Sequence, residues 1–327
     1  MVATNRLDAL LNEYKGNIFE YLTCQFVARY YGVEKVFLES LTEDMLSILE
    51  QQESYLRNYF PYLLKELPKL ADLTAKEIKK YLGEKSICKV SLLGKVLANQ
   101  QNSHLKETDF ILEEDNGQIY PVSLKISKSG AYVNSKSAGL KTFFLKYFSL
   151  FSCEQIQQQF NEFCDYHYEE MAIAMHAEAD IEYEQGFKNW VCCGMEVLPG
   201  QLEEQYRHYL LDYYAKVNAQ LLKLLKELYD KDQKIFAECL KALIGFSYAE
   251  IIQVTAFYKL KDGVFDHHWV HIVKNEELKV LDFKMRKNNF DILLHHLALQ
   301  IRVKPMNTFT AKAFKINCAV KYNSTST

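Results

Sequence analysis

The sequence predicts an α/β fold in which a mixed central sheet is flanked by helices, enlarged by helical insertions and followed by a β-rich C-terminal part. Three observations lead to this prediction. Apolar residues recur at helical spacing over long stretches, between residues 6 and 82 and between 153 and 246. Two short apolar runs between residues 107 and 126 are separated by an Asn-Gly turn. After about residue 248, short apolar runs bounded by turn signals predict strands.

The N-terminal part is expected to be helical. A stripe of apolar residues over about 6–31 predicts a first helix that packs on the sheet. Thr42 is placed to open a further helix, and Pro61 and Pro68 are expected to interrupt the helical stretch. The segment 74–77 resembles a capping box before another helix.

The middle of the chain is predicted to start with strands and to continue with helices. A strand is expected near Cys88–Leu93, and a hairpin over 107–126 turns at 113–118. Ser135 or Ser137 is placed to cap a helix that runs to Phe148. Two longer helical regions follow at about 153–185 and 201–246.

The C-terminal part is expected to be rich in strands. Lys261-Asp262-Gly263 has turn composition, and His295-His296 is taken as the end of a helix. The predicted strands are 251–260, 267–273, 278–283, 298–304 and 314–322.

Composition restricts the class of protein. With 327 residues and 49% hydrophobic content, the chain can fill one large core or two ordinary ones. No apolar run approaches the roughly 20 residues of a membrane span, so a soluble, cytoplasmic protein without membrane contact is expected. The eight cysteines lack metal-ligand spacing and are expected to be reduced, mostly buried thiols.

Charge is unevenly distributed although the net charge is only −3. The stretch from Asn116 to Cys153 contains five lysines and no acidic residue. The stretch from Ile292 to the C-terminus likewise contains lysines and an arginine and no acidic residue. Such stretches predict two local positive fields on a mildly acidic body.

Asp109 and Lys125 are the candidate functional pair. Each lies in one of the two short apolar runs of the predicted hairpin, so their side chains can meet across adjacent strands. Taken alone, such a pair is more often a solvated cross-strand ion pair worth tenths of a kcal/mol. A carboxylate and an ammonium group so placed are also the elements of a metal-dependent phosphodiesterase site.

The sequence resembles the PD-(D/E)XK nucleases, and within them the type II restriction endonucleases. The resemblance rests on residues 108–111, residues 122–125 and the N-terminal helix segment 15–20, which looks like the family's first core helix with an inward-facing Glu20. It implies a restriction-endonuclease-like fold. The expected domains are a nuclease core over 1–150 with a helical insertion at about 36–85, a helical region over 151–247, and a β-rich region over 248–327 suited to DNA recognition.

The resemblance also implies roles for individual residues. Asp109 would bind Mg²⁺, Lys125 would position the attacking water and stabilise the extra charge on phosphorus, and Glu20 would be a second acidic contributor. The family usually has Asp or Glu two residues before the lysine, where this chain has Ser123. Glu20, Glu107 and Glu154 are the candidates that would replace the missing carboxylate, with Glu20 preferred.

Two groups of cations are candidates for DNA contact. Lys128, Lys136 and Lys141 follow the predicted site and are expected to contact phosphates. In the C-terminal part, Arg and Lys side chains with neighbouring asparagines are suited to read base edges or bind phosphate. Target recognition is therefore expected from Arg286, Lys287, Arg302 and Lys304. The run His267 to His271 places alternate side chains on one strand face and is interpreted as a strand surface or a DNA-facing group, not as a metal site.

The working hypothesis is a Mg²⁺-dependent endonuclease acting on double-stranded DNA as part of a restriction system. A homodimer would suit a palindromic target, and a cognate DNA methyltransferase encoded nearby would protect the host sites. Two alternatives remain open: a nucleic-acid-binding protein with a decayed nuclease core, and a repair or defence nuclease of the same fold acting on another nucleic acid.

Overall fold

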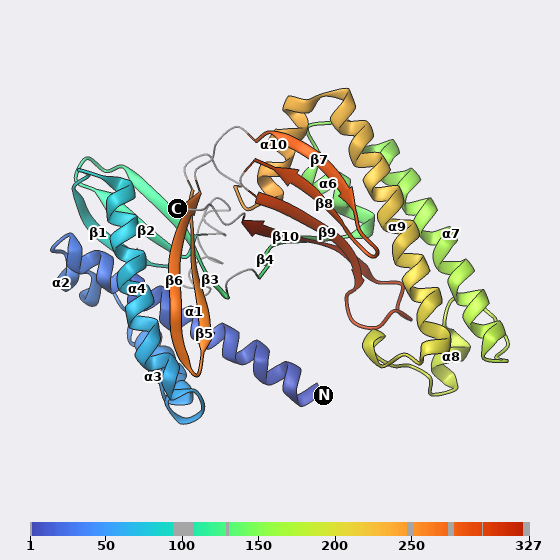
Figure 1. The fold of residues 1–327 in the computed structure, drawn as a ribbon, viewed down its shortest axis with the longest axis horizontal. Helices are drawn as coiled ribbons and strands as arrows, with labels where there is room; N and C mark the ends of the chain where they lie inside the picture. The colour runs from blue at the N-terminus through green and yellow to red at the C-terminus, as the bar shows by residue number, and fades with distance from the viewer. Residues whose placement is uncertain are drawn as a thin grey trace. The chain divides into compact units, whose positions relative to one another are not determined.

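The computed structural model describes residues 2–93, 108–128, 131–246, 251–273, 278–295 and 297–322. The chain forms two compact units that are each discontinuous in sequence (Figure 1). Unit 1 comprises residues 1–131 and 246–276, and unit 2 comprises residues 132–245 and 277–327. A mixed α/β architecture is therefore confirmed.

Unit 1 contains a mixed five-stranded sheet. Its strands, in spatial order, are β1 (Ile87–Leu92), β2 (Phe110–Glu114), β3 (Ile119–Lys128), β5 (Ile252–Lys261) and β6 (Val264–Val273). Neighbouring strands are antiparallel except for β3 and β5, which are parallel. A parallel pair needs a long crossover connection. Here the crossover contains the whole first segment of unit 2.

Helices cover one face of this sheet. They are α1 (Val2–Tyr30), α2 (Glu34–Glu39), α3 (Glu43–Tyr59) and α4 (Pro61–Leu82). α1 contacts β1 and β3, and α4 contacts β5 and β6. Leu67 and Leu70 of α4 are fully buried in the same core as Val122 and Val254 of the parallel pair. Strands buried on this face explain the near-continuous apolar runs from which they were predicted.

Unit 2 contains an antiparallel five-stranded sheet backed by helices. Its strands, in spatial order, are β4 (Val133–Gly139), β10 (Phe314–Tyr322), β9 (Leu297–Pro305), β8 (Phe290–Leu294) and β7 (Val280–Met285). Its helices are α6 (Phe143–Tyr147), α7 (Glu154–Glu178), α8 (Lys188–Cys192), α9 (Glu204–Lys231) and α10 (Gln233–Leu243), with 3₁₀ turns at Leu140–Thr142 and Pro199–Gln201. α7 and α9 run side by side (Figure 1).

The units differ from the three consecutive regions expected from sequence. β5 and β6 were expected in a separate C-terminal region, but they complete the sheet that contains β2 and β3. β4 was expected in the first region, but it pairs with β10 in unit 2. Both pairings join segments more than 100 residues apart, which local patterns do not reveal.

Two expected helix interruptions were wrong. Pro68 lies inside α4, and Thr74 lies in the middle of the same helix instead of capping a new one. The hydroxyl of Thr74 donates a hydrogen bond of 2.7 Å to the carbonyl of Leu70, which satisfies it inside the helix. Burial of the flanking apolar face outweighs the backbone hydrogen bond lost at Pro68.

Other expectations of local structure also need correction. Ser135 and Ser137 lie in β4 instead of capping a helix, because pairing with β10 decides the conformation of this polar segment. β8 was not anticipated, and His295 follows this strand in a turn instead of ending a helix. In contrast, Thr42 caps α3 as expected, because its side chain accepts a hydrogen bond from Met45 N.

The sequence also led to the expectation of reduced, mostly buried cysteines and of no membrane-spanning segment. All eight cysteines are free, and five of them are buried. Among the residues that the structure describes, no helix combines the length and apolar character that a membrane span requires.

Candidate active site

The β2–β3 hairpin positions the candidate pair. Its turn is the expected Asn-Gly turn: Gly117 has φ +83° and Asn116 Oδ1 accepts a 2.8 Å hydrogen bond from Gln118 N. Glu114 N donates to Gln118 O at 2.9 Å and closes the turn. Positive φ is a conformation in which glycine carries no steric cost. The turn fixes the register, and with it the neighbours of Asp109 on β3.

Asp109 lies one residue before β2 and not within a strand as expected, but it stays paired with β3. Its backbone N–H donates to the carbonyl of Val122 at 2.9 Å. Its side-chain oxygen Oδ2 accepts hydrogen bonds from Leu124 N at 2.5 Å and from Ser123 Oγ at 3.4 Å. These donors fix the orientation of the carboxylate.

Lys125 completes the pair. Its Nζ atom lies 3.8 Å from Asp109 Oδ2, and the side chains of Lys125 and Asp109 are 48% and 22% exposed. At this exposure, an ion pair contributes little to stability. The pair therefore lies where both side chains reach solvent and where a ligand can reach them.

Ser123 occupies the position where the resemblance leads one to expect a carboxylate. It is 7% exposed, and its hydroxyl donates to Asp109 instead of adding a negative charge. Because residues two apart on a strand share a face, Ser123, Lys125 and Ser127 project from the same side of β3. Their register partners on β5 are Gln253, Thr255 and Phe257.

Glu20 lies on α1, one helical turn before the buried Cys24. Burial raises the pKa of the Cys24 thiol, and the negative charges of Glu20 and Asp109 raise it further. Because both carboxylates act on this one buried thiol, both lie in its neighbourhood. Helix α1 therefore brings Glu20 towards the hairpin, although 89 residues of sequence separate the two acids.

Glu107 and Glu154 are the other two carboxylates expected as candidate metal ligands. Glu107 lies outside the described residues. Glu154 lies in the first turn of α7 and belongs to unit 2. Of the three candidates, Glu20 is the one whose charge acts on the same buried thiol as the charge of Asp109.

The donor set suits a hard cation. Within the described ranges, no group of three or more His, Cys, Asp and Glu side chains is arranged to hold a metal ion. Mg²⁺ differs from zinc in needing only one or two carboxylates, with water and substrate phosphate oxygens completing its coordination shell. Asp109 supplies one carboxylate of this kind.

An aromatic row lies beside Lys125 on the same face of the sheet. Ser127, Phe257 and Trp269 are register partners across β3, β5 and β6. The rings of Phe257 and Trp269 stack with centroids 5.2 Å apart, and His267 lies 5.3 Å from Trp269. The alternation expected for the histidine run is thus present, with His268 on the opposite face as the partner of Tyr258.

The expected DNA-contacting cations are divided between the units. Lys128 ends β3 in unit 1. The others lie in unit 2: Lys136, Lys141, Arg286, Lys287, Arg302 and Lys304. Lys141 pairs with Asp165 at 3.0 Å, and Arg286 pairs with the buried Asp291 at 2.8 Å. Burial, followed by the charge of Lys146, lowers the pKa of Lys136 to about 8.

One face of the unit 2 sheet gathers several of these cations. Along β9, the apolar Leu299, Ile301 and Val303 are buried, and Arg302 and Lys304 alternate with them on the other face. Lys315 and Asn317 on β10 are their register partners. Burial lowers the pKa of Lys304, and the charges of Arg302 and Lys315 lower it further, so the three cations are close together. We call Arg302, Lys304 and Lys315 the cationic face.

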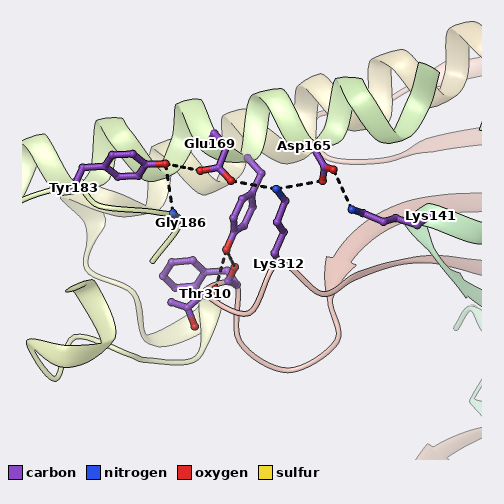
Figure 2. Close-up of polar contacts among 9 residues, drawn as sticks. Lys141, Asp165, Glu169, Tyr183, Gly186, Thr310 and Lys312 are labelled. Carbon is purple, nitrogen blue, oxygen red and sulfur yellow. Dashed lines mark hydrogen bonds and ion pairs between the residues drawn. The ribbon is translucent and has the colours of Figure 1, made fainter. Parts of the chain in front are cut away.

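Lys312 is part of a separate cluster on α7 (Figure 2). Its ammonium lies 3.4 Å from Asp165 and 3.1 Å from Glu169, and it lies over the ring of Tyr168. The Tyr168 hydroxyl donates to the carbonyl of Thr310 at 2.8 Å. These contacts tie the β9–β10 connection to α7, so the charge of Lys312 is used within the fold.

Comparisons with protein-family models, with curated proteins and with solved structures give no match. The functional proposal therefore rests on the site itself.

Proposed function

We propose that this chain is a Mg²⁺-dependent endonuclease that hydrolyses phosphodiester bonds in double-stranded DNA, similar to the type II restriction endonucleases. The supporting observation is the convergence of Ser123, Leu124 and Lys125 on one oxygen of Asp109 at the end of a hairpin. A solvent-exposed ion pair without a functional role would not need two further hydrogen-bond donors on the same carboxylate oxygen.

Each residue has a defined task in this proposal. Asp109 and Glu20 would hold the metal, which when bound supplies Lewis-acid activation of the phosphate and of water. Hydrogen bonds from β3 hold the Asp109 carboxylate in place, so little reorganisation is needed. The Lys125 ammonium would orient the attacking water and stabilise the negative charge that develops on the phosphoryl oxygens.

The cationic face supports a nucleic-acid substrate. Arg302, Lys304 and Lys315 can neutralise backbone phosphates. Duplex DNA has the charge density that such an array fits.

Plasmid cleavage tests the proposal. Purified protein is incubated with plasmid in MgCl₂ and in EDTA, beside Asp109→Asn and Lys125→Met. We expect either substitution to slow cutting by about a hundredfold or more, because each removes a charge used in the transition state. Asp115→Asn at the exposed turn and Lys261→Met at the end of β5 are matched controls and should cut normally. Equal cutting by all five proteins would refute the assignment.

Ser123 favours one alternative. With a hydroxyl in place of a carboxylate, the site could have lost its metal and kept its nucleic acid, as in a decayed nuclease core. Such a protein would bind DNA equally well in EDTA and in MgCl₂ and would cut in neither. A repair or defence nuclease would instead prefer single-stranded DNA or RNA when these substrates are compared with the duplex.

Two partners follow from the proposal. A second copy of the chain would supply the site for the opposite strand, which sedimentation of the protein with a short duplex would detect as a dimer. A cognate DNA methyltransferase would protect host DNA, and plasmid methylated by it would resist cutting.

A further inference from the structure

Lys15 is a buried cation that the proposed reaction does not use. It lies on α1 with 8% of its surface exposed. Its Nζ atom donates hydrogen bonds to Asn12 Oδ1 at 3.1 Å and to the Tyr258 hydroxyl at 3.3 Å, and it lies 5.6 Å from the centroid of the Tyr258 ring. Both partners are neutral. Burying a cation without an opposite charge is costly, so its presence needs an explanation.

Two more basic side chains flank Tyr258 on the same face of the sheet. Its register partner on the parallel strand β3 is Lys128, and its partner on β6 is His268. His268 Nδ1 is buried and has no hydrogen-bond partner among the described residues. Lys128 is exposed. Lys15 thus contacts the Tyr258 hydroxyl, and Lys128 and His268 flank Tyr258 on the two neighbouring strands, while Phe265 stacks on its ring with centroids 4.2 Å apart.

Carboxylates near this cluster are engaged elsewhere. On α4, Glu66 accepts hydrogen bonds from Phe265 N at 3.2 Å and from Lys69 at 2.7 Å, and the Tyr62 hydroxyl is a further titratable group close enough to act on Tyr258. Burial, followed by the charge of Lys128, lowers the pKa of Lys15 to about 8. Among the described residues, no negative charge acts against these effects, so the described part of the cluster lacks an anion.

We infer that Lys15, Lys128 and His268 form, around Tyr258, a binding site for a phosphate group. An ammonium held by two neutral hydrogen-bond partners keeps one donor for an oxyanion, Lys128 adds a second charge, and the His268 ring can donate another hydrogen bond when Nδ1 carries its proton. A bound phosphate would provide the missing negative charge. That this phosphate belongs to a nucleic-acid backbone rests on the proposed function; the need for an anion does not.

A purely structural role for Lys15 makes the opposite prediction for stability. If the bonds to Asn12 and Tyr258 were there to hold α1 on β5, then Lys15→Met would destabilise the fold. If the buried charge is kept for a ligand, the apolar methionine of similar length relieves the cost of burial, and the unligated variant is at least as stable as the natural chain.

The test measures binding and stability of the full chain in EDTA, where no cutting occurs. Sulfate is the probe for a free oxyanion, because its charge does not change near pH 8, and a 20-base-pair duplex is the probe for backbone phosphate. We expect Lys15→Met and Lys128→Met each to weaken binding about tenfold, the worth of one charge-assisted hydrogen bond. His268→Gln should weaken it less, and Lys15→Arg should restore it. Binding by the natural chain should weaken as pH rises through 8.

The controls separate the possible outcomes. Lys261→Met removes an exposed lysine near the same end of the sheet and should bind both probes normally. Loss of sulfate binding alone supports the site and overturns the backbone as the source of its phosphate. Unchanged binding in both Lys15→Met and Lys128→Met, or clear destabilisation of Lys15→Met with Lys128→Met binding normally, overturns the inference. Plasmid cleavage in MgCl₂ is measured separately from these binding results in EDTA, so failure of the proposed cleavage would be distinguished from failure of the phosphate site.

Discussion

Folding places the Lys15 ammonium in a buried position next to Tyr258, and this placement makes stability depend on pH. The folded-state pKa is about 8, against 10.5 for an exposed lysine. Below pH 8, Lys15 is protonated in both the folded and the unfolded chain. Burying its charge then lowers the free energy of unfolding by roughly 3 kcal/mol, before any structural relaxation. Between pH 8 and 10.5 the unfolded chain binds more protons, so stability rises with pH.

Urea unfolding at several pH values tests this dependence. The natural chain should gain stability from pH 8 to about 9.5, below the range where tyrosines ionise. Lys15→Met should lack this gain and should be the more stable protein at pH 7. Parallel profiles for the two proteins would contradict the placement of Lys15.

Ser123 offers a gain-of-function test of the proposed metal site. Its hydroxyl oxygen lies 3.4 Å from Asp109 Oδ2, so Ser123→Asp would place a second carboxylate beside the first. The two negative charges repel one another without metal and attract a dication together. We expect a lower melting temperature in EDTA and a larger rise on adding MgCl₂. Ser127→Asp, on the same face of β3, is the control; an equal MgCl₂ response in both variants would argue against a metal at Asp109.

At the scale of elements, the hairpin and the first helix each contain a glycine, and these two glycines should respond oppositely to substitution. Gly117 has φ +83° in the β2–β3 turn, whereas Gly16 lies within α1, and a Cβ atom at either position meets nothing within 4 Å. Gly117→Ala should cost about 1–2 kcal/mol from backbone strain alone. Gly16→Ala should stabilise by about 0.5–1 kcal/mol. Denaturant midpoints measure both effects, and the same sign for the two would contradict the assigned turn or the assigned helix.

The same two elements indicate how much could be predicted from sequence. The Asn116-Gly117 turn and the pairing of Asp109 with Lys125 were predictable because turn chemistry and strand register act over a few residues. The contact between Lys15 and Tyr258 could not be predicted, because Tyr258 lies 243 residues further along the chain. Thr74 has the local pattern of a helix start, but burial of α4 overrides that pattern. Local signals therefore located the candidate pair, and long-range packing determined the surroundings of Lys15.

At the scale of the whole molecule, the chain sequence divides the proposed tasks between two units. The crossover from β3 to β5 contains the first segment of unit 2, so the unit with the candidate catalytic pair and the unit with the cationic face cannot be separated by a single cut in the chain. Deletion of unit 2 would also remove the connection that the parallel pair needs. Point substitutions are therefore the appropriate way to test the role of unit 2.

The salt dependence of duplex binding tests that role. Each phosphate that a protein neutralises contributes about one unit to the slope of log affinity against log salt. In EDTA, the double variant Arg302→Met, Lys304→Met should bind more weakly, with a slope shallower by about two. A matched control is Lys234→Met together with Lys223→Met, which remove two exposed lysines from α10 and α9. Because these helices pack on the apolar side of the sheet, the control should keep the natural slope. If both double variants lowered the slope equally, the effect would reflect net charge, and the cationic face would have no specific role in holding DNA.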